Sequence, residues 1–437
     1  MTQTAGRDAT GVRFGAAGVA VTVATLVTNA LAYVVPMLGA RRLSAADLGA
    51  LATVLALGAI AAVPGFGLQI AVAAHRARWG GGGGAGRLGL RTAALTAAVA
   101  VAAAPVLTIA LRLPVALTLL LAASTFATVL SGRWLGELQG DQRFLRLAVA
   151  MTVLAAGRYG GLVLGLLLGR GPVACLLLGT LTGLLALPLL ARLAAPPTPA
   201  LAATAPPTTT PPGPATRPAA DAAGPAGVTG PTAGEEPDAT GVSRQLAARQ
   251  VMTACGATLA MLTISYADLI LARQLLPAAS SGAYAVGSVL TKGALWAPQV
   301  VTLLVLPRLA RGDRRARLVA LALILTCGAV LVAASAIGGE LAFRLVGGAD
   351  YLHLAGSAPL FAATGALYAV VFMLVNDRVA TAARWPAAPL WVATAGLALA
   401  TALIAPRTVT GVLSCALAAA TVTAVAMAWL VFRPARR

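Results

Sequence analysis

Residues 173–190 read VACLLLGTLTGLLALPLL and contain no charged side chain, although Arg170 and Arg192 lie just beyond the two ends. A helix of this length approaches the roughly 20 residues that span the hydrocarbon core of a bilayer. Similar runs recur along the chain: 59% of its 437 residues are hydrophobic and only 10% are charged, whereas an ordinary soluble domain is about 25% charged. The composition therefore predicts an all-α integral membrane protein and excludes a soluble globular fold.

Apolar runs of this kind occur on both sides of one proline-rich stretch, six before it and six after it. They lie at 14–38, 48–74, 92–111, 115–135, 147–168 and 173–190, and then at 246–271, 280–306, 318–337, 359–375, 390–405 and 411–432. The first run is longer than the 7–15 apolar residues of a signal peptide, so we expect it to be retained. The sequence thus predicts about twelve transmembrane helices.

The proline-rich stretch, 191–243, holds 12 of the 26 prolines among Ala, Thr and Gly. It lacks apolar periodicity, and such a composition predicts a disordered or polyproline-like linker. The expected organisation is an N-terminal six-helix lobe (1–190), a cytoplasmic linker (191–243) and a C-terminal six-helix lobe (244–437).

The positions of the arginines predict the orientation, because Lys and Arg accumulate in short cytoplasmic loops. With the N-terminus inside, all but seven loop arginines fall on the cytoplasmic side; the seven are Arg41, Arg42, Arg112, Arg170, Arg273, Arg344 and Arg407. We therefore expect a multi-pass protein of the cell membrane with both termini cytoplasmic. Topology explains the net charge of +19 better than nucleic-acid binding does, since no aromatic-rich basic domain is present.

The two halves carry a similar hairpin after their first helix. Residues 40–43 (ARRL) precede 49–52 (GALA), and residues 272–275 (ARQL) precede 282–285 (GAYA), with one extra residue in the second hairpin. Parallel repeats of transporters are related in this way by an axis along the membrane normal. The pattern favours a duplicated six-helix unit, the alternative being chance similarity between alanine-rich segments.

Three stretches are similar to polysaccharide biosynthesis flippases of the oligosaccharide-lipid exporter type (Wzx-like), in the superfamily that also includes multidrug and toxin extrusion (MATE) exporters. They are LGARRLSAADLG at 38–49 running into VPGFGLQ at 63–69, GELQGDQRF at 136–144 ahead of Arg158, and Asp268 followed by LLP at 275–277, GAY at 282–284 and LPR at 306–308. The resemblance covers most of the chain with loose patterns. Many members of the family carry fourteen spans, and the linker is unusually long here, which keeps the exporter branch in contention.

The resemblance implies a MATE-like, V-shaped pair of six-helix lobes around a central cavity that opens alternately to either side. The implied cargo is an undecaprenyl-diphosphate-linked oligosaccharide whose polyprenyl tail stays in the lipid. Polysaccharide polymerase and glycosyltransferases would be working partners, and H⁺ or Na⁺ a coupling ion. The alternative is a MATE-like multidrug or cation-coupled exporter, which should line its lobes with carboxylates.

Two basic residues, Arg158 and Lys292, lie deep within predicted spans. An intramembrane charge is costly and marks a functional site by default, and fixed cations would stabilise an anionic diphosphate, Arg through its forked donors and Lys as a point charge. Snorkelling to the interface is the alternative for Arg158. Asp268, the one carboxylate well inside a span, could pair with a cation or titrate in ion coupling.

Further polar or helix-breaking residues complete the candidate set. Asn29 and Gln299 would line the cavity or bond between helices. Hinge candidates are Pro64, Gly65, Gly67 and Pro298, because proline frees backbone carbonyls.

Signals for enzymatic chemistry are absent from the sequence. The glycine run 80–84 lacks a following Lys-Ser/Thr, and no GxSxG or HExxH pattern occurs. The four cysteines lie far apart without metal-ligand spacing. We expect no enzyme, cofactor or metal; a membrane-embedded glycosyltransferase or polymerase, the remaining class, would need a larger extramembrane domain.

Overall fold

A computed structural model of the chain describes residues 23–79, 84–195, 239–298 and 314–433, apart from positions 26, 382 and 384. Every regular element in these residues is helical. After a first span at Val23–Arg42, the helices are α2 (Ala45–Ala61), α3 (Val63–Trp79), α4 (Ala85–Leu111), α5 (Val115–Gly140), α6 (Phe144–Leu167), α7 (Pro172–Ala194), α8 (Ala239–Leu275), α9 (Ala278–Trp296), α11 (Arg314–Ile337), α12 (Gly339–Val346), the 3-10 helix η1 (Ala349–Ser357), α13 (Ala358–Ala380), α14 (Ala388–Leu403) and α15 (Val409–Phe432).

The described residues contain 10 helices long and apolar enough to cross a membrane. Two of the twelve predicted spans are not among them. The span predicted at 390–405 corresponds to α14, which is shorter. The span predicted at 280–306 is described only as far as residue 298, and its described part is α9. The prediction of an all-α, multi-pass membrane protein is confirmed.

The second span is a helix with a break rather than one continuous rod. Ser44 caps α2 by accepting a hydrogen bond from the Asp47 amide, and α2 ends before Ala62. Pro64 is the second residue of α3. Backbone N–H groups in the first turn of a helix make no intrahelical hydrogen bond, so proline is tolerated there. The predicted helix 48–74 is therefore α2 and α3 in sequence, and Pro64 lies at their junction.

Residues 338–358, which lie between the predicted spans 318–337 and 359–375, contain the short helices α12 and η1. Phe343 and Val346 of α12 are buried in the core. Gly338 and Gly347 flank α12, and glycines at these positions are typical of a loop. The helix forms nevertheless, because one of its faces is apolar and packs inward.

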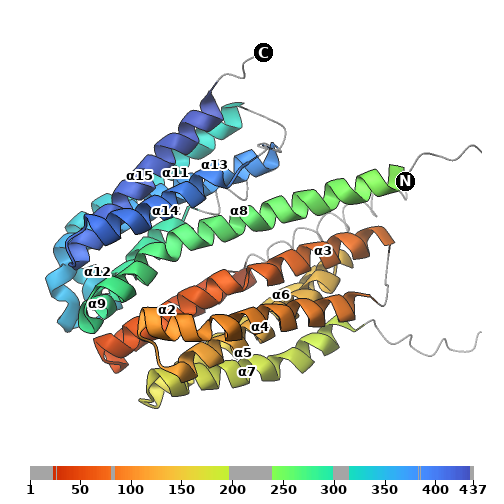
Figure 1. The fold of residues 1–437 in the computed structure, drawn as a ribbon, viewed down its shortest axis with the longest axis horizontal. Helices are drawn as coiled ribbons and strands as arrows, with labels where there is room; N and C mark the ends of the chain where they lie inside the picture. The colour runs from red at the N-terminus through yellow and green to blue at the C-terminus, as the bar shows by residue number, and fades with distance from the viewer. Residues whose placement is uncertain are drawn as a thin grey trace, which may run out of the picture.

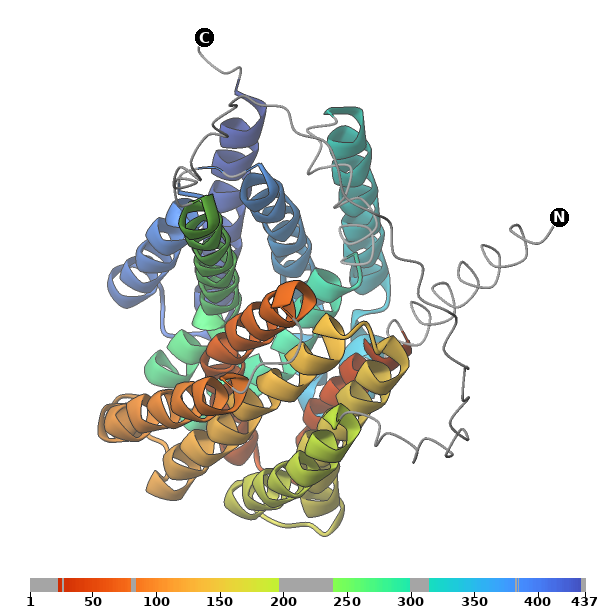
Figure 2. The same ribbon diagram turned by 90° about the vertical axis from the view of Figure 1, so that its right-hand side faces the viewer.

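The described helices form two groups, which we call the N-lobe (the first span and α2–α7) and the C-lobe (α8, α9, α11–α15 and η1). Figure 1 shows the groups meeting at the end that carries α2, α9 and α12, hereafter the contact end, and diverging toward the end where α7 stops and α8 starts. Viewed from that second end, the N-lobe fills one half of the molecule and the C-lobe the other (Figure 2). Contacts between the lobes are made chiefly by α2 with α8 and α9 and by α3 with α8.

Apolar side chains divide between the interior and the outer surface of the bundle. At the contact end one buried cluster joins Leu48 of α2 to Tyr284, Phe343 and Phe361 of the C-lobe. Long apolar residues such as Ile109 and Leu185 are strongly exposed, as expected for helices whose outer faces contact lipid tails.

Candidate functional site

Asp268 lies inside the C-lobe, where its side chain is 2% exposed. The Tyr284 hydroxyl donates to its Oδ2 at 2.8 Å, and the Leu269 amide donates to its Oδ1 at 2.8 Å. The Tyr368 hydroxyl is buried within electrostatic range of the same carboxyl group but has no hydrogen-bond partner among the described residues. A carboxyl group in this setting is held by hydrogen bonds rather than exposed to lipid.

Lys292, on α9, faces the neighbouring turn of α8. Its Nζ lies 3.6 Å from the centroid of the Tyr266 ring and donates a hydrogen bond to the Ser265 carbonyl. Asp268 is within electrostatic range of Lys292, but the two side chains do not form an ion pair within 4 Å. The ion pairs in the described part of the chain are Arg76–Asp141, Arg133–Glu137 and Arg317–Asp377. The ammonium group is thus stabilised by a cation–π contact and a carbonyl.

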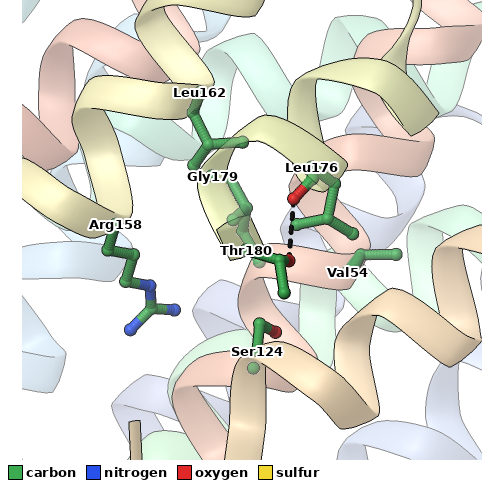
Figure 3. Close-up of a pocket in the computed structure, with 9 residues that line it drawn as sticks. Val54, Ser124, Arg158, Leu162, Leu176, Gly179 and Thr180 are labelled. Atoms are coloured by element: carbon green, nitrogen blue, oxygen red, sulfur yellow. Dashed lines mark hydrogen bonds between the residues drawn. The ribbon is translucent and has the colours of Figure 1, made fainter. Parts of the chain in front are cut away.

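Arg158 belongs to the other lobe, on α6. It lines a small pocket between α2, α5, α6 and α7 together with the side chains of Ser124 and Thr180, and Figure 3 shows its guanidinium group at one edge of that pocket. The guanidinium carbon lies 5.6 Å from the centroid of the adjacent Tyr159 ring. No carboxylate within 4 Å pairs with Arg158 in the residues described, so its charge is available to an anion.

Tyr266 connects these groups across the boundary between the lobes. Besides contacting Lys292, it lies within electrostatic range of Arg158 and Tyr159 of the N-lobe and of Tyr33 on the first span. The Tyr33 hydroxyl is buried and has no hydrogen-bond partner among the residues described. The structure therefore places Lys292 against the Tyr266 ring and Arg158, from the other lobe, within electrostatic range of it.

The tyrosines were missed by reasoning from the sequence. The chain has only six, and five of them form the surroundings of Arg158, Lys292 and Asp268: Tyr33, Tyr159, Tyr266, Tyr284 and Tyr368. Their rarity, and their position inside apolar runs, was the signal available, because a tyrosine hydroxyl buried in a membrane protein usually needs a polar partner.

The remaining sequence candidates lie elsewhere. Asn29 is exposed on the first span, and Gln299 lies outside the described residues. Gly65 and Gly67 are inside α3, where a Cβ atom would come 3.0 Å from the Val129 Cα of α5 and 2.8 Å from the Cys255 Sγ of α8, respectively.

Pro298 is buried immediately after α9. In this conformation Gly65 and Gly67 allow close helix packing. The hinge role of these glycines and of Pro298 stays a prediction. Among the described residues no group of three or more His, Cys, Asp or Glu could hold a metal ion.

No protein-family model and no curated protein sequence matches the chain. Its structure is similar to solved membrane transporters. A multidrug resistance MATE family transporter in an inward-facing conformation shares 13% identity over 92% of this chain and 94% of its own, with a TM-score of 0.61. An outward-facing structure of a transporter of the same description, also 13% identical, covers 94% of this chain and 93% of its own at 0.50.

The lipid II flippase MurJ in an inward closed conformation is also similar, at 10% identity over 94% of this chain and 87% of its own, with a TM-score of 0.62. Identities this low establish the fold alone. The chain therefore has a helical membrane fold similar to that of these MATE transporters and MurJ.

Proposed function

We propose that the protein is a flippase that moves a lipid-linked oligosaccharide diphosphate across the membrane by alternating access. The observation that carries this proposal is a pair of cations from opposite lobes: Lys292 contacts the Tyr266 ring, and Arg158 lies within electrostatic range of the same tyrosine. A diphosphate between the lobes would meet a forked guanidinium on one side and a point charge on the other. A ligand held by both lobes is also sensitive to their relative position, which is what alternating access requires.

The surrounding tyrosines suit the rest of such a cargo. Rings such as Tyr159 and Tyr266 offer apolar faces and hydroxyl groups, a combination that can contact both faces and edges of a sugar. The proposed cargo is an undecaprenyl-diphosphate-linked saccharide for cell-surface polysaccharide assembly, with H⁺ or Na⁺ as the coupling ion and Asp268 as the group that would bind it.

A multidrug or cation-coupled exporter is the second candidate, favoured by the similarity to MATE transporters. An exporter of cationic drugs should present carboxylates between its lobes. Among the described residues the acid within electrostatic range of Tyr266 is Asp268, which Tyr284 already binds inside the C-lobe. Two cations, Arg158 and Lys292, act on the same tyrosine or contact it. This balance of charge supports an anionic cargo.

The proposal is tested by flipping of a fluorescent lipid-diphosphate saccharide in proteoliposomes. A desolvated charge-assisted hydrogen bond contributes about 1.5–3 kcal/mol, so Arg158→Ala or Lys292→Ala should weaken head-group binding roughly ten- to a hundredfold. Lys292→Arg, which keeps the charge, should be milder. Arg146→Ala removes an exposed arginine from the same helix as Arg158 and should leave flipping unchanged.

Wild-type flipping in both alanine variants would refute the proposal. Efflux of a cationic dye without flipping would favour the exporter, and elongation of the saccharide would indicate a polymerase. Thermal unfolding of each variant, measured alongside, separates loss of binding from loss of folded protein.

A further inference from the structure

Arg273, at the end of α8, binds main-chain oxygens of the N-lobe. It is 9% exposed, and its guanidinium donates to the carbonyls of Leu111, Arg112 and Ala46 at 3.1, 3.2 and 3.3 Å. Leu111 is the last residue of α4 and Arg112 is its C-cap. The guanidinium therefore lies at the negative end of the α4 dipole and binds carbonyls that have no partner within the helix.

Arg41 makes the corresponding contact in the opposite direction. At the end of the first span, it donates through Nη2 to the Leu345 carbonyl at 2.9 Å, in the last turn of α12. Arg41 and Arg273 occupy equivalent places in the two repeated hairpins, ARRL and ARQL. Two of the Arg273 acceptors, Leu111 and Arg112, lie between the third and fourth spans of the N-lobe. The Arg41 acceptor, Leu345, lies between the third and fourth spans of the C-lobe.

Two glycines of the same repeated hairpins meet in this region of the contact end. A Cβ atom on Gly49 would come 2.6 Å from the Ser281 Oγ and 3.0 Å from the Gly282 amide nitrogen. A Cβ atom on Gly282 would overlap the Ala45 carbonyl. The backbones of α2 and α9 therefore touch directly, in an approach that only glycine permits.

We propose that Arg41 and Arg273 form a reciprocal latch that closes the contact end and opens once in each transport cycle. The acceptors are carbonyl groups, which water can replace when the lobes separate, so the latch is reversible. Arg273 makes three bonds in a buried setting and Arg41 one in an exposed setting, which makes Arg273 the stronger half. The inference rests on the alternating-access part of the proposed function and is independent of the cargo.

The latch is tested by distance measurements between spin labels in nanodiscs. Leu168→Cys and His353→Cys place one label on each lobe at exposed positions of the contact end, in a chain whose four native cysteines are replaced by alanine. Loss of the contacts should raise the ratio of separated to closed lobes several-fold for Arg41→Ala and roughly tenfold or more for Arg273→Ala. Arg42→Ala removes the neighbouring exposed arginine and should leave the distances unchanged.

Two further variants distinguish loss of the latch contacts from unfolding of the protein. Arg273→Lys keeps the charge but cannot span three carbonyls, so it should give an intermediate ratio. Gly282→Ala should separate the lobes by steric overlap while both arginines are intact. Unchanged distances in folded Arg41→Ala and Arg273→Ala, or an equal shift in Arg42→Ala, would overturn the latch; if Arg273→Ala does not fold, Arg41→Ala alone decides. Because no cargo is needed, failure here is distinct from failure of the flipping assay.

Discussion

Replacing Tyr284 with phenylalanine isolates the hydrogen bond that holds Asp268 in the C-lobe. The edge-on contact between the Tyr284 and Phe361 rings, whose centroids are 5.4 Å apart, is retained in Tyr284→Phe, so only the hydroxyl is lost. The Asp268 Oδ2 then loses its donor while it remains buried. An unsatisfied buried acceptor costs about 1–3 kcal/mol, and we expect the free energy of unfolding to fall by that amount.

Tyr368→Phe is a matched control for this measurement. Tyr368, like Tyr284, is fully buried and lies near Asp268, but its hydroxyl has no partner among the described residues. Removing an unpaired buried hydroxyl should be neutral or stabilising. Denaturant unfolding of the purified variants in detergent gives both values, and a loss below about 0.5 kcal/mol in Tyr284→Phe, or an equal loss in both variants, would refute the assigned hydrogen bond.

Other predictions concern the ion pairs, the topology and the linker. Arg317→Ala should lower the free energy of unfolding by about 3 kcal/mol, because it leaves the buried Asp377 unpaired; the double variant with Asp377→Ala should recover part of that loss in the same denaturation experiment. Reporter fusions placed within 200–235 should report the cytoplasmic side, and an external signal would contradict the predicted orientation. Deleting 205–235 should leave insertion and flipping nearly intact, and loss of folded protein in a detergent-solubility assay would show that this segment packs against a lobe.

The helical membrane fold could be predicted because it depends on composition and run length. A span such as α7 is recognisable from one uninterrupted apolar run, whereas α12 is not, because its eight residues fall between glycines and carry an arginine. The break between α2 and α3 was signalled by Pro64, but Pro105 lies inside the continuous helix α4. A proline thus indicates where a break is tolerated, and tertiary packing decides whether it occurs.

The candidate site was only partly accessible from the sequence, for a physical reason. Charge in an apolar run is conspicuous, so Arg158, Lys292 and Asp268 could be selected by depth alone. Pairing depends on which helix faces which. Lys292 contacts Tyr266 rather than forming a close ion pair with Asp268, and that choice is fixed by the packing of α8 against α9, which no single-sequence pattern records.

Residues of the predicted internal repeat have equivalents in both lobes, whereas the charged residues of the candidate site do not, and this difference bears on the proposed mechanism. At the contact end Gly49 meets its counterpart Gly282, and Arg41 and Arg273 each bind a main-chain carbonyl of the opposite lobe. This is the arrangement expected of residues near a two-fold axis relating the two predicted repeats. In the same sequence alignment Ala59 corresponds to Lys292 and Pro36 to Asp268, so neither of these two charged residues has a charged counterpart. The proposed closure would move one lobe against the other and can use two equal halves. A cargo with a distinct head and tail has no such symmetry, and a site that recognises it must differ between the lobes.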